Sequence, residues 1–266
     1  MIHHYDFDLF VIGGGSGGVR AARMAGQRGA RVALAECAEL GGTCVNVGCV
    51  PKKLYSYAAG YAAAFEEAPG YGWTLPEAPR FDWATLKRQR AQEITRLNGV
   101  YQKLLDGAGV KTLTGWAQLV DGHTVSVSDT RYTARHILVA TGGMPAAPDM
   151  PGRELAVVSD AMFDLPDFPK RLLVMGGGYI GCEFASLFRG LGAHVTLVNR
   201  GAHILNGFDD DVREALAREM GRQGIDLRMT AQVETLRREG DGLVARLSRG
   251  QQIEADTVLL ATGRKP

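Results

Sequence analysis

The sequence predicts an α/β protein of two three-layer domains on one plan, and two repeated patterns carry this prediction. A glycine-rich turn occurs twice, within FDLFVIGGGSGG at 7–18 and within RLLVMGGGYIG at 171–181, each time directly after an apolar run. The pattern L-x-A-T-G also occurs twice, at 138–142 and 259–263. An apolar strand, a glycine turn, a helix and another strand at this spacing form a βαβ unit with a parallel sheet. The two halves therefore look like a duplication of one unit.

Each half is predicted to contain the same elements in the same order. In the first half we expect a strand at 7–12, a helix from about Ser16 to near Gly29, a strand at 31–36 and a β-rich excursion at 110–139. In the second half we expect a strand at 171–175, a helix at 179–191 that stops at Gly192, a strand at 194–198 and a β-rich excursion at 226–262.

The halves divide into predicted domains at 1–150 and 151–266. Pro145, Pro148 and Pro151 mark the linker, because proline interrupts regular structure. The first half also carries an insertion at about 50–106 that the second lacks. Its stretch 83–105 has helical spacing, with Ile94, Leu97, Tyr101, Leu104 and Leu105 on one side.

Composition limits the classes of partner. Thirty Lys and Arg residues against 29 Asp and Glu leave a formal net charge of +1, which argues against nucleic acid or an anionic membrane as the main partner. No apolar run approaches a membrane span, and the chain enters its first strand without a signal peptide, so we expect a cytoplasmic protein. The chain stops directly after an apolar strand, and we therefore expect a truncated sequence.

The two glycine turns predict two dinucleotide sites. The first glycine permits the sharp bend, the second lets the backbone approach a pyrophosphate, and the helix N-terminus adds amide donors and a positive dipole. Glu36 ends the second strand of the first half, 23 positions after Gly13. A carboxylate there accepts hydrogen bonds from a ribose diol, which suits FAD or NAD. The alternative is a solvated acid at a strand end.

The second turn differs in the residue that reads the ribose. The same offset from Gly176 reaches Asn199, with Arg200 beside it. Loss of the acid and gain of a cation favour the 2′-phosphate of NADPH. Two features argue for NADH instead: a glycine at 181, where NADP sites often carry alanine, and Asn206 at the place where a second arginine would stand.

Cys44 and Cys49 lie in GGTCVNVGCVPKK at 41–53 and form a candidate redox dithiol. Pro51 suits the first turn of a helix, whose dipole would lower the thiol pKa values together with the neighbouring lysines. The alternatives are a structural zinc pair or two buried cysteines, but no second Cys/His pair has matching spacing. We give Cys37 and Cys182 structural roles. The six histidines, at 3, 4, 123, 136, 194 and 203, form no ligand pattern, so no metal site is expected.

This dithiol motif, between a G-G-G-S-G-G turn and GGGYIGCEFA at 176–185, resembles the FAD-dependent pyridine nucleotide–disulfide reductases, and among them the glutathione reductases. The resemblance covers the whole chain. It implies that Cys44 attacks the substrate disulfide and that Cys49 faces the flavin as a thiolate. It also implies that Lys52 lies beside the flavin and pairs with Glu183, and that Tyr179 covers the flavin until nicotinamide displaces it. The alternatives without a function are an exposed lysine for Lys52, an acid on a helix face for Glu183 and a core tyrosine for Tyr179.

The resemblance extends to a substrate site. Ser16 and Arg23 match positions that hold glutathione carboxylates, and Tyr101 matches a tyrosine between the two glutathione halves. The trypanothione enzymes place an acid and a tryptophan where this chain has Arg20 and Arg23, which favours an anionic disulfide. The residues expected to contact FAD or NADPH are Gly13, Gly15, Ser16, Gly17, Gly18, Glu36, Gly42, Thr43, Lys52, Thr141, Gly142, Gly176, Gly178, Tyr179, Ile180, Glu183, Arg200 and Gly263.

The resemblance also implies parts that lie beyond residue 266. Members continue into a second FAD-contact segment and a dimerisation domain whose His–Glu pair supplies a proton across a homodimer. We therefore expect NADPH-dependent reduction of glutathione disulfide, within redox homeostasis, with the dimerisation domain absent from this chain. The alternatives are a dihydrolipoyl dehydrogenase, a mercuric reductase, or an inactive nucleotide-binding fragment.

Overall fold

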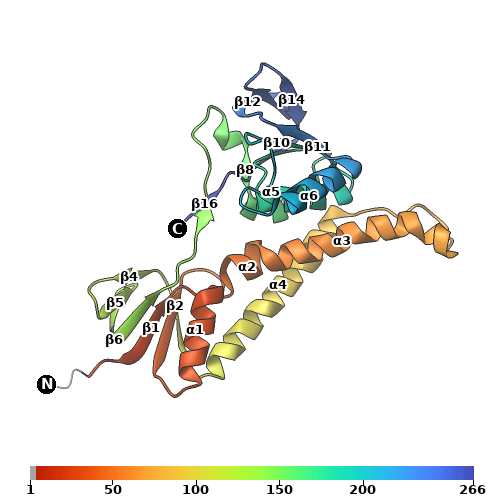
Figure 1. Cartoon of the computed structure of the whole chain (residues 1–266). Helices are drawn as coiled ribbons and strands as arrows, with labels where there is room; N and C mark the ends of the chain where they lie inside the picture. The colour runs from red at the N-terminus through yellow and green to blue at the C-terminus, as the bar shows by residue number, and fades with distance from the viewer. Residues whose placement is uncertain (1–3) are drawn as a thin grey trace. The chain divides into compact units, whose positions relative to one another are not determined.

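The computed structural model describes residues 4–266, so His3 lies outside the described residues (Figure 1). The contacts among its residues divide the chain into two compact units. The first runs up to Pro51 and includes Gln89–Gly143, and the second comprises Lys52–Arg88 and Met144–Lys265. Division by contact thus places Lys52–Arg88 with the second unit, although these residues lie within the first range predicted from the sequence.

The first unit is built on a six-stranded sheet in the order β3-β2-β1-β6-β5-β4. Strands β3, β2, β1 and β6 are parallel, whereas β6, β5 and β4 form an antiparallel ribbon. The strands are β1 (Phe7–Ile12), β2 (Val32–Glu36), β3 (Lys111–Thr114), β4 (Ala117–Leu119), β5 (Thr124–Val127) and β6 (Thr130–Val139). The predicted β-rich excursion at 110–139 therefore supplies the whole ribbon and two of the four parallel strands, β3 and β6.

Alternating side chains of β1 separate the two faces of this sheet. Val11 points into a cluster with Val19 and Ala22 of helix α1 (Ser16–Gly26) and with Leu105 of helix α4 (Trp83–Asp106). Phe10 points to the other face, where it packs with residues of the β4–β6 ribbon. Because successive side chains of a strand alternate, one apolar strand supplies two cores. The unit accordingly has the three predicted layers, and Figure 1 shows α1 and the ribbon on opposite sides of β1.

The second unit repeats this plan. Its sheet has the order β11-β10-β9-β15-β8, with all pairs parallel. The strands are β8 (Val157–Val158), β9 (Arg171–Met175), β10 (His194–Asn199), β11 (Asp226–Met229) and β15 (Thr257–Leu260). Helices α5 (Tyr179–Gly190) and α6 (Asp210–Arg222) pack on strands of this sheet. An antiparallel meander of β12 (Val233–Glu239), β13 (Gly242–Leu247) and β14 (Gln252–Ala255) buries Leu173 and Val198 between itself and the sheet. The α/β class with two Rossmann-like domains is confirmed.

Helix α3 (Cys49–Glu67) extends much further than the sequence indicates. Pro51 lies in its first turn, as predicted, but most of its later residues are exposed and present no apolar periodicity. Alanine-rich stretches favour a helix without such a face. Tyr55 anchors the helix in the second unit: it is fully buried and its hydroxyl donates to the Phe163 carbonyl at 2.9 Å.

Helix α4 matches the predicted stretch closely, with one difference in its apolar face. Leu105 is fully buried, whereas Leu104 is 39% exposed, because the helical turn carries Leu104 away from the sheet. Helix α6 was not predicted, and it begins at the Asp209 side chain, which accepts from the amides of Asp211 and Val212.

The shorter elements complete the chain. They are helix α2 (Gly42–Val47), the 3₁₀ turns at Ala68–Tyr71, Arg153–Leu155 and Ser159–Phe163, and the paired strands β7 (Met144–Pro145) and β16 (Arg264–Lys265). Across residues 4–266, none of the helices combines the length and the apolar character needed to traverse a lipid bilayer.

The glycines at the start of α1 give a test of this packing. A Cβ on Gly18 would lie 1.8 Å from the Gly13 carbonyl oxygen, whereas a Cβ on Gly17 would meet nothing within 4 Å. We therefore expect Gly18→Ala to lower the free energy of unfolding by about 1–3 kcal/mol, as overpacking does. Gly17→Ala should leave it unchanged or raise it by up to about 1 kcal/mol, because alanine favours a helix.

Urea unfolding without added nucleotide, followed by circular dichroism, measures both variants. Equal stability of the two variants would contradict the close approach of α1 to the β1 turn.

Candidate functional site

The glycine turn after β1 has the geometry of a phosphate-binding loop. Gly13 has a φ of +107°, and a Cβ there would lie 2.4 Å from the Ala140 carbonyl oxygen. Gly15 occupies the N-cap position of α1, where no side chain caps the helix. The first-turn amides are thus left for a ligand, and a phosphate satisfies them best because of the helix dipole.

The Glu36 carboxylate is held inside this loop. Its Oε2 accepts from the Gly14 amide at 2.6 Å and its Oε1 accepts from the Ala38 amide at 2.8 Å. These bonds set the carboxylate at the carboxyl end of β2, next to the glycine turn. In this place it can accept from the two hydroxyls of a ribose, as the sequence predicts for FAD or NAD.

The turn after β9 reproduces this arrangement with a neutral side chain. Gly176 has a φ of +110°, and a Cβ there would lie 2.4 Å from the Ala261 carbonyl oxygen. The Asn199 Oδ1 accepts from the Gly177 amide at 3.2 Å, as Glu36 does from Gly14. Gly178 is the N-cap of α5, again without a side-chain cap. The L-x-A-T-G repeats therefore supply the two alanine carbonyls against which the first glycines pack.

Arg200 follows Asn199 and is exposed. The Asn199 Nδ2 donates to the carbonyls of Gly201 and His203 at 3.2 and 2.9 Å, which fixes the turn that carries Arg200. Within residues 4–266, the Arg200 guanidinium has no ion-pair partner. It is available to an anionic ligand.

The candidate dithiol is attached directly to the first glycine turn. Gly41 and Gly42 have positive φ, the Gly41 amide donates to the Gly14 carbonyl at 2.8 Å, and a Cβ on Gly42 would lie 2.7 Å from the Gly15 Cα. Helix α2 thus starts in contact with the nucleotide loop and carries Cys44, whereas Cys49 opens α3. All four cysteines are thiols in this structure.

Two asparagines that the sequence reasoning missed hold α2 in place. The Asn46 Nδ2 donates to the Gly42 carbonyl at 2.9 Å. The Asn98 Nδ2, on α4, donates to the Asn46 Oδ1 at 2.9 Å and to the Leu40 carbonyl at 2.8 Å. The position of Asn46 between the two cysteines could have signalled this role, but nothing in the sequence pairs it with Asn98.

The environment of Cys44 differs from the sequence expectation. Burial raises the pKa of the Cys44 thiol above its ordinary value, and the hydrogen bond and charge of Cys49 raise this pKa further. The Cys49 amide and the Ser16 hydroxyl act in the opposite direction. The lowering predicted from the helix dipole and the lysines is therefore wrong for Cys44, because loss of hydration outweighs it.

The second unit brings together the three residues predicted to surround the flavin. Lys52 forms an ion pair with Glu183, and its Nζ lies 5.7 Å from the centroid of the Tyr179 ring. Tyr179 and Glu183 are one helical turn apart on α5, so both reach the same lysine. Lys52 is mostly buried and Tyr179 is 53% exposed. Their contact with a flavin stays a prediction.

The remaining predicted residues occupy varied places. Arg23 is half-buried, and its Nε has no hydrogen-bond partner within the described part of the chain. Tyr101 packs on the helix side of the first core. Thr43, Thr141 and Gly142 are exposed in the first unit, as Gly263 is in the second, where Ile180 is half-buried. Cys182 is buried, which raises its pKa to about 11, whereas Cys37 is exposed.

The neighbours of Cys44 generate a test of its environment. Cys49→Ala removes a group that raises the Cys44 pKa, so this pKa should fall, while burial keeps it above that of a free thiol. Ser16→Ala removes a group that lowers the pKa, so the pKa should rise. The pH dependence of alkylation, read by mass spectrometry of the peptide that carries Cys44, measures both shifts. Shifts of the same sign in the two variants would rule out this account.

Comparison with known proteins places these features in a family. Residues 7–266 match the pyridine nucleotide-disulphide oxidoreductase family. The glutathione reductase of Burkholderia cepacia is 49% identical over 98% of this chain and 58% of its own length. The glutathione reductase of Nostoc is 44% identical over 98% of this chain and 57% of its own length.

A solved structure agrees with the sequence comparison. The HOCl-induced flavoprotein disulfide reductase RclA from Escherichia coli superposes with a TM-score of 0.85 at 25% identity, covering 99% of this chain and 58% of the other. This chain thus spans a little over half the length of these relatives. It belongs to the pyridine nucleotide-disulphide oxidoreductase family, whose members bind FAD and NAD(P)H.

Proposed function

We propose that the protein carrying this chain reduces glutathione disulfide with NADPH, through FAD and the Cys44–Cys49 pair. The observation that carries the proposal is the joining of the dithiol to the nucleotide loop. Gly42 of α2 touches Gly15 of the turn, and Ser16, the next residue, lies within hydrogen-bond reach of Cys44. A ligand bound to that turn would therefore lie close to the sulfur atoms.

The residues of the first unit fit FAD. The uncapped amides of α1 suit a pyrophosphate, and nothing would contact a Cβ on Gly17, so the loop leaves open space on that side. The Glu36 carboxylate suits the ribose diol. In the second unit, Glu183 holds Lys52 in position, and the family resemblance implies a positive charge of this lysine beside the ring.

FAD held by the α1 turn and Glu36 would supply the chemistry that couples oxidation of the reduced nicotinamide to two-electron reduction of the Cys44–Cys49 disulfide. The chain's own residues then carry out thiol–disulfide exchange. The Cys44 thiolate attacks one sulfur of glutathione disulfide, the S–S bond breaks, and one glutathione leaves and takes a proton. The Cys49 thiolate attacks Cys44 in the mixed disulfide and releases the second glutathione. The dithiol is thereby oxidised by two electrons, and its two protons complete the two glutathione thiols.

The raised pKa of Cys44 has a consequence for this exchange. Only the thiolate is nucleophilic, and burial together with the hydrogen bond and charge of Cys49 raises the pKa of Cys44, which disfavours its thiolate. A neighbouring group that favours the thiolate therefore assists the attack. The Ser16 hydroxyl favours the thiolate, which gives this residue a role in the chemistry beside its predicted contact with substrate.

The choice of glutathione has two supports. The relatives at 49%, 44% and 42% identity are glutathione reductases. Arg23 lies two turns along α1 from Ser16, on the same face of the helix, and its guanidinium charge suits a carboxylate. Glutathione disulfide is anionic, whereas lipoamide is neutral, so an arginine favours the former.

Steady-state assays test this assignment. We expect NADPH oxidation with a higher kcat/KM for glutathione disulfide than for lipoamide or mercuric ion. Cys44→Ser should abolish disulfide reduction, because the attacking sulfur is lost. Cys37→Ser is the matched control and should keep the rate, since Cys37 is exposed and outside the dithiol. A higher kcat/KM for lipoamide would reject glutathione as the substrate.

Arg200 is expected to favour NADPH over NADH. Arg200→Glu should lower the preference for NADPH by on the order of 2–3 kcal/mol, because a charge-assisted bond is lost and repulsion is added. The ratio of kcat/KM for the two nucleotides measures this change. Arg238→Glu, the same charge reversal at an exposed position of β12, should leave the ratio unchanged. An unaltered ratio in the Arg200 variant would show that another residue sets the choice.

A further inference from the structure

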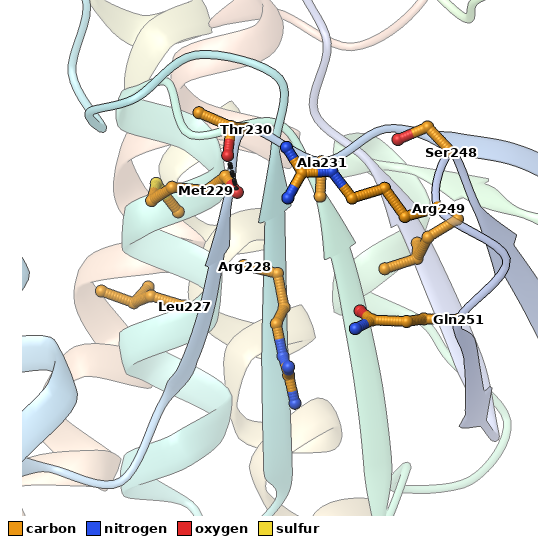
Figure 2. A pocket seen from close by; sticks show the side chains of 9 residues that line it. Leu227, Arg228, Met229, Thr230, Ala231, Ser248, Arg249 and Gln251 are labelled. Atoms are coloured by element: carbon orange, nitrogen blue, oxygen red, sulfur yellow. Dashed lines mark hydrogen bonds between the residues drawn. The ribbon is translucent and has the colours of Figure 1, made fainter.

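The second unit contains a polar cavity beside the Arg200 turn. It has a volume of about 230 Å³ and lies between the carboxyl end of β11 and the turn that joins β13 to β14 (Figure 2). Arg228, Thr230 and Ala231 line one side, and Ser248, Arg249 and Gln251 line the other. This volume suits one small group of a ligand rather than a whole dinucleotide.

Hydrogen bonds fix the position of the β13–β14 turn. The Ser248 amide donates to the Gln232 carbonyl at 2.8 Å, and the Ser248 Oγ accepts from the Gln232 amide at 3.3 Å. The Leu247 amide donates to the Gln251 carbonyl at 2.8 Å, which closes the turn. Arg249 therefore projects from a fixed backbone, and Figure 2 shows its guanidinium extending across the cavity towards Thr230 and Ala231.

The opposite wall of the cavity is bonded to the Arg200 turn itself. The Thr230 amide donates to the Gly201 carbonyl at 3.1 Å, and the Ala231 amide donates to the Asn199 carbonyl at 3.1 Å. These two acceptors flank Arg200 in the sequence. Thr230 has a φ of +51°, an unfavourable conformation for a β-branched residue. Such strain is retained where the surrounding structure requires it, often at a binding site.

Charge distinguishes Arg249 from its neighbour Arg228. The Arg228 Nε donates to the Asp226 carboxylate at 2.8 Å, so its charge is neutralised. Arg249 has no carboxylate partner in residues 4–266, and Arg200 has none either. The Ser248 hydroxyl, whose oxygen accepts from an amide, keeps its proton for donation. Arg249 and Ser248 line the cavity, and Arg200 lies on the turn that is bonded to its opposite wall. Two unpaired guanidinium groups and a hydroxyl donor suit a phosphate.

We propose that Arg249 is a specificity-determining residue that recognises, together with Arg200, the 2′-phosphate of NADPH. The proposal rests on the proposed function, because it takes NADPH as the cofactor. Arg249 would supply the second cation of the phosphate site, since Asn206 stands where the sequence would otherwise place a second arginine. Arg249 lies 49 residues beyond Arg200 in the sequence and reaches the site only through the hairpin between β13 and β14.

Binding of small nucleotides tests Arg249 without turnover or flavin. The probes are 2′,5′-ADP, which carries the 2′-phosphate, and 5′-AMP, which lacks it, titrated by calorimetry. We expect Arg249→Ala to weaken 2′,5′-ADP binding about tenfold or more, the effect of one charge-assisted hydrogen bond, and to leave 5′-AMP binding unchanged. Arg249→Lys, which keeps the charge but not the planar fork, should recover part of the loss.

Arg238→Ala is the matched control. It removes the same charge from an exposed position near the other end of the meander and should change neither affinity. Thermal unfolding of each variant checks that the unit still folds. If the Arg249→Ala variant bound 2′,5′-ADP as tightly as the wild type, while Arg200→Ala weakened this binding, the role of Arg249 alone would be overturned. A wild-type protein that binds the two probes equally would overturn NADPH as the cofactor, and with it this proposal.

Discussion

The close approach of a helix to the strand before it, permitted by one glycine in each unit, is the contact on which the candidate site depends. At Gly18 a Cβ would lie 1.8 Å from the Gly13 carbonyl oxygen, and at Gly181 it would lie 2.0 Å from the Gly176 oxygen. This approach directs the free amides of the helix N-terminus over the end of the sheet. In the first unit the same turn presents Gly15 to Gly42, so the dithiol helix starts against the phosphate loop. Nucleotide loop and dithiol thus form a single packed feature.

The two units use one backbone frame with different charges. Glu36 and Asn199 bond to the amide of the second glycine in their respective turns, so a carboxylate and an amide hold equivalent places. The carboxylate would repel a 2′-phosphate, whereas the amide leaves the neighbouring Arg200 unopposed. Because the frame is common, the difference between the sites lies in a few side chains at the ends of β2 and β10. The proposed role of Arg249 extends this difference to the meander, which in the second unit replaces the ribbon of the first.

The thiols show how burial can outweigh the local sequence context. A helix start and two lysines would lower a thiol pKa, but burial and the adjacent Cys49 raise that of Cys44. Lys52 is already paired with Glu183, and Lys53 lies over the Tyr57 ring at 4.9 Å, so both cations have other partners. The attack on a disulfide then depends on removal of a proton from Cys44, and the Ser16 hydroxyl is the side chain of the first glycine turn that favours this change.

The sequence by itself determined the features that repeat or that follow a local period. Apolar strands, glycine turns and the long amphipathic stretch of α4 predicted the two sheets and their helices. The spacing predicted Glu36 and Asn199, and the resemblance to the disulfide reductases implied the Lys52–Glu183 pair. The start of helix α3 was predicted from Pro51, but its length was not, because its later residues are mostly exposed and lack an apolar period. Only the tertiary structure decided the bond from Asn98 to Asn46, the raised pKa of Cys44 and the position of Arg249 beside the Arg200 turn. Each of these depends on residues that are distant in the chain or on the extent of burial, and neither property is contained in local patterns of residues.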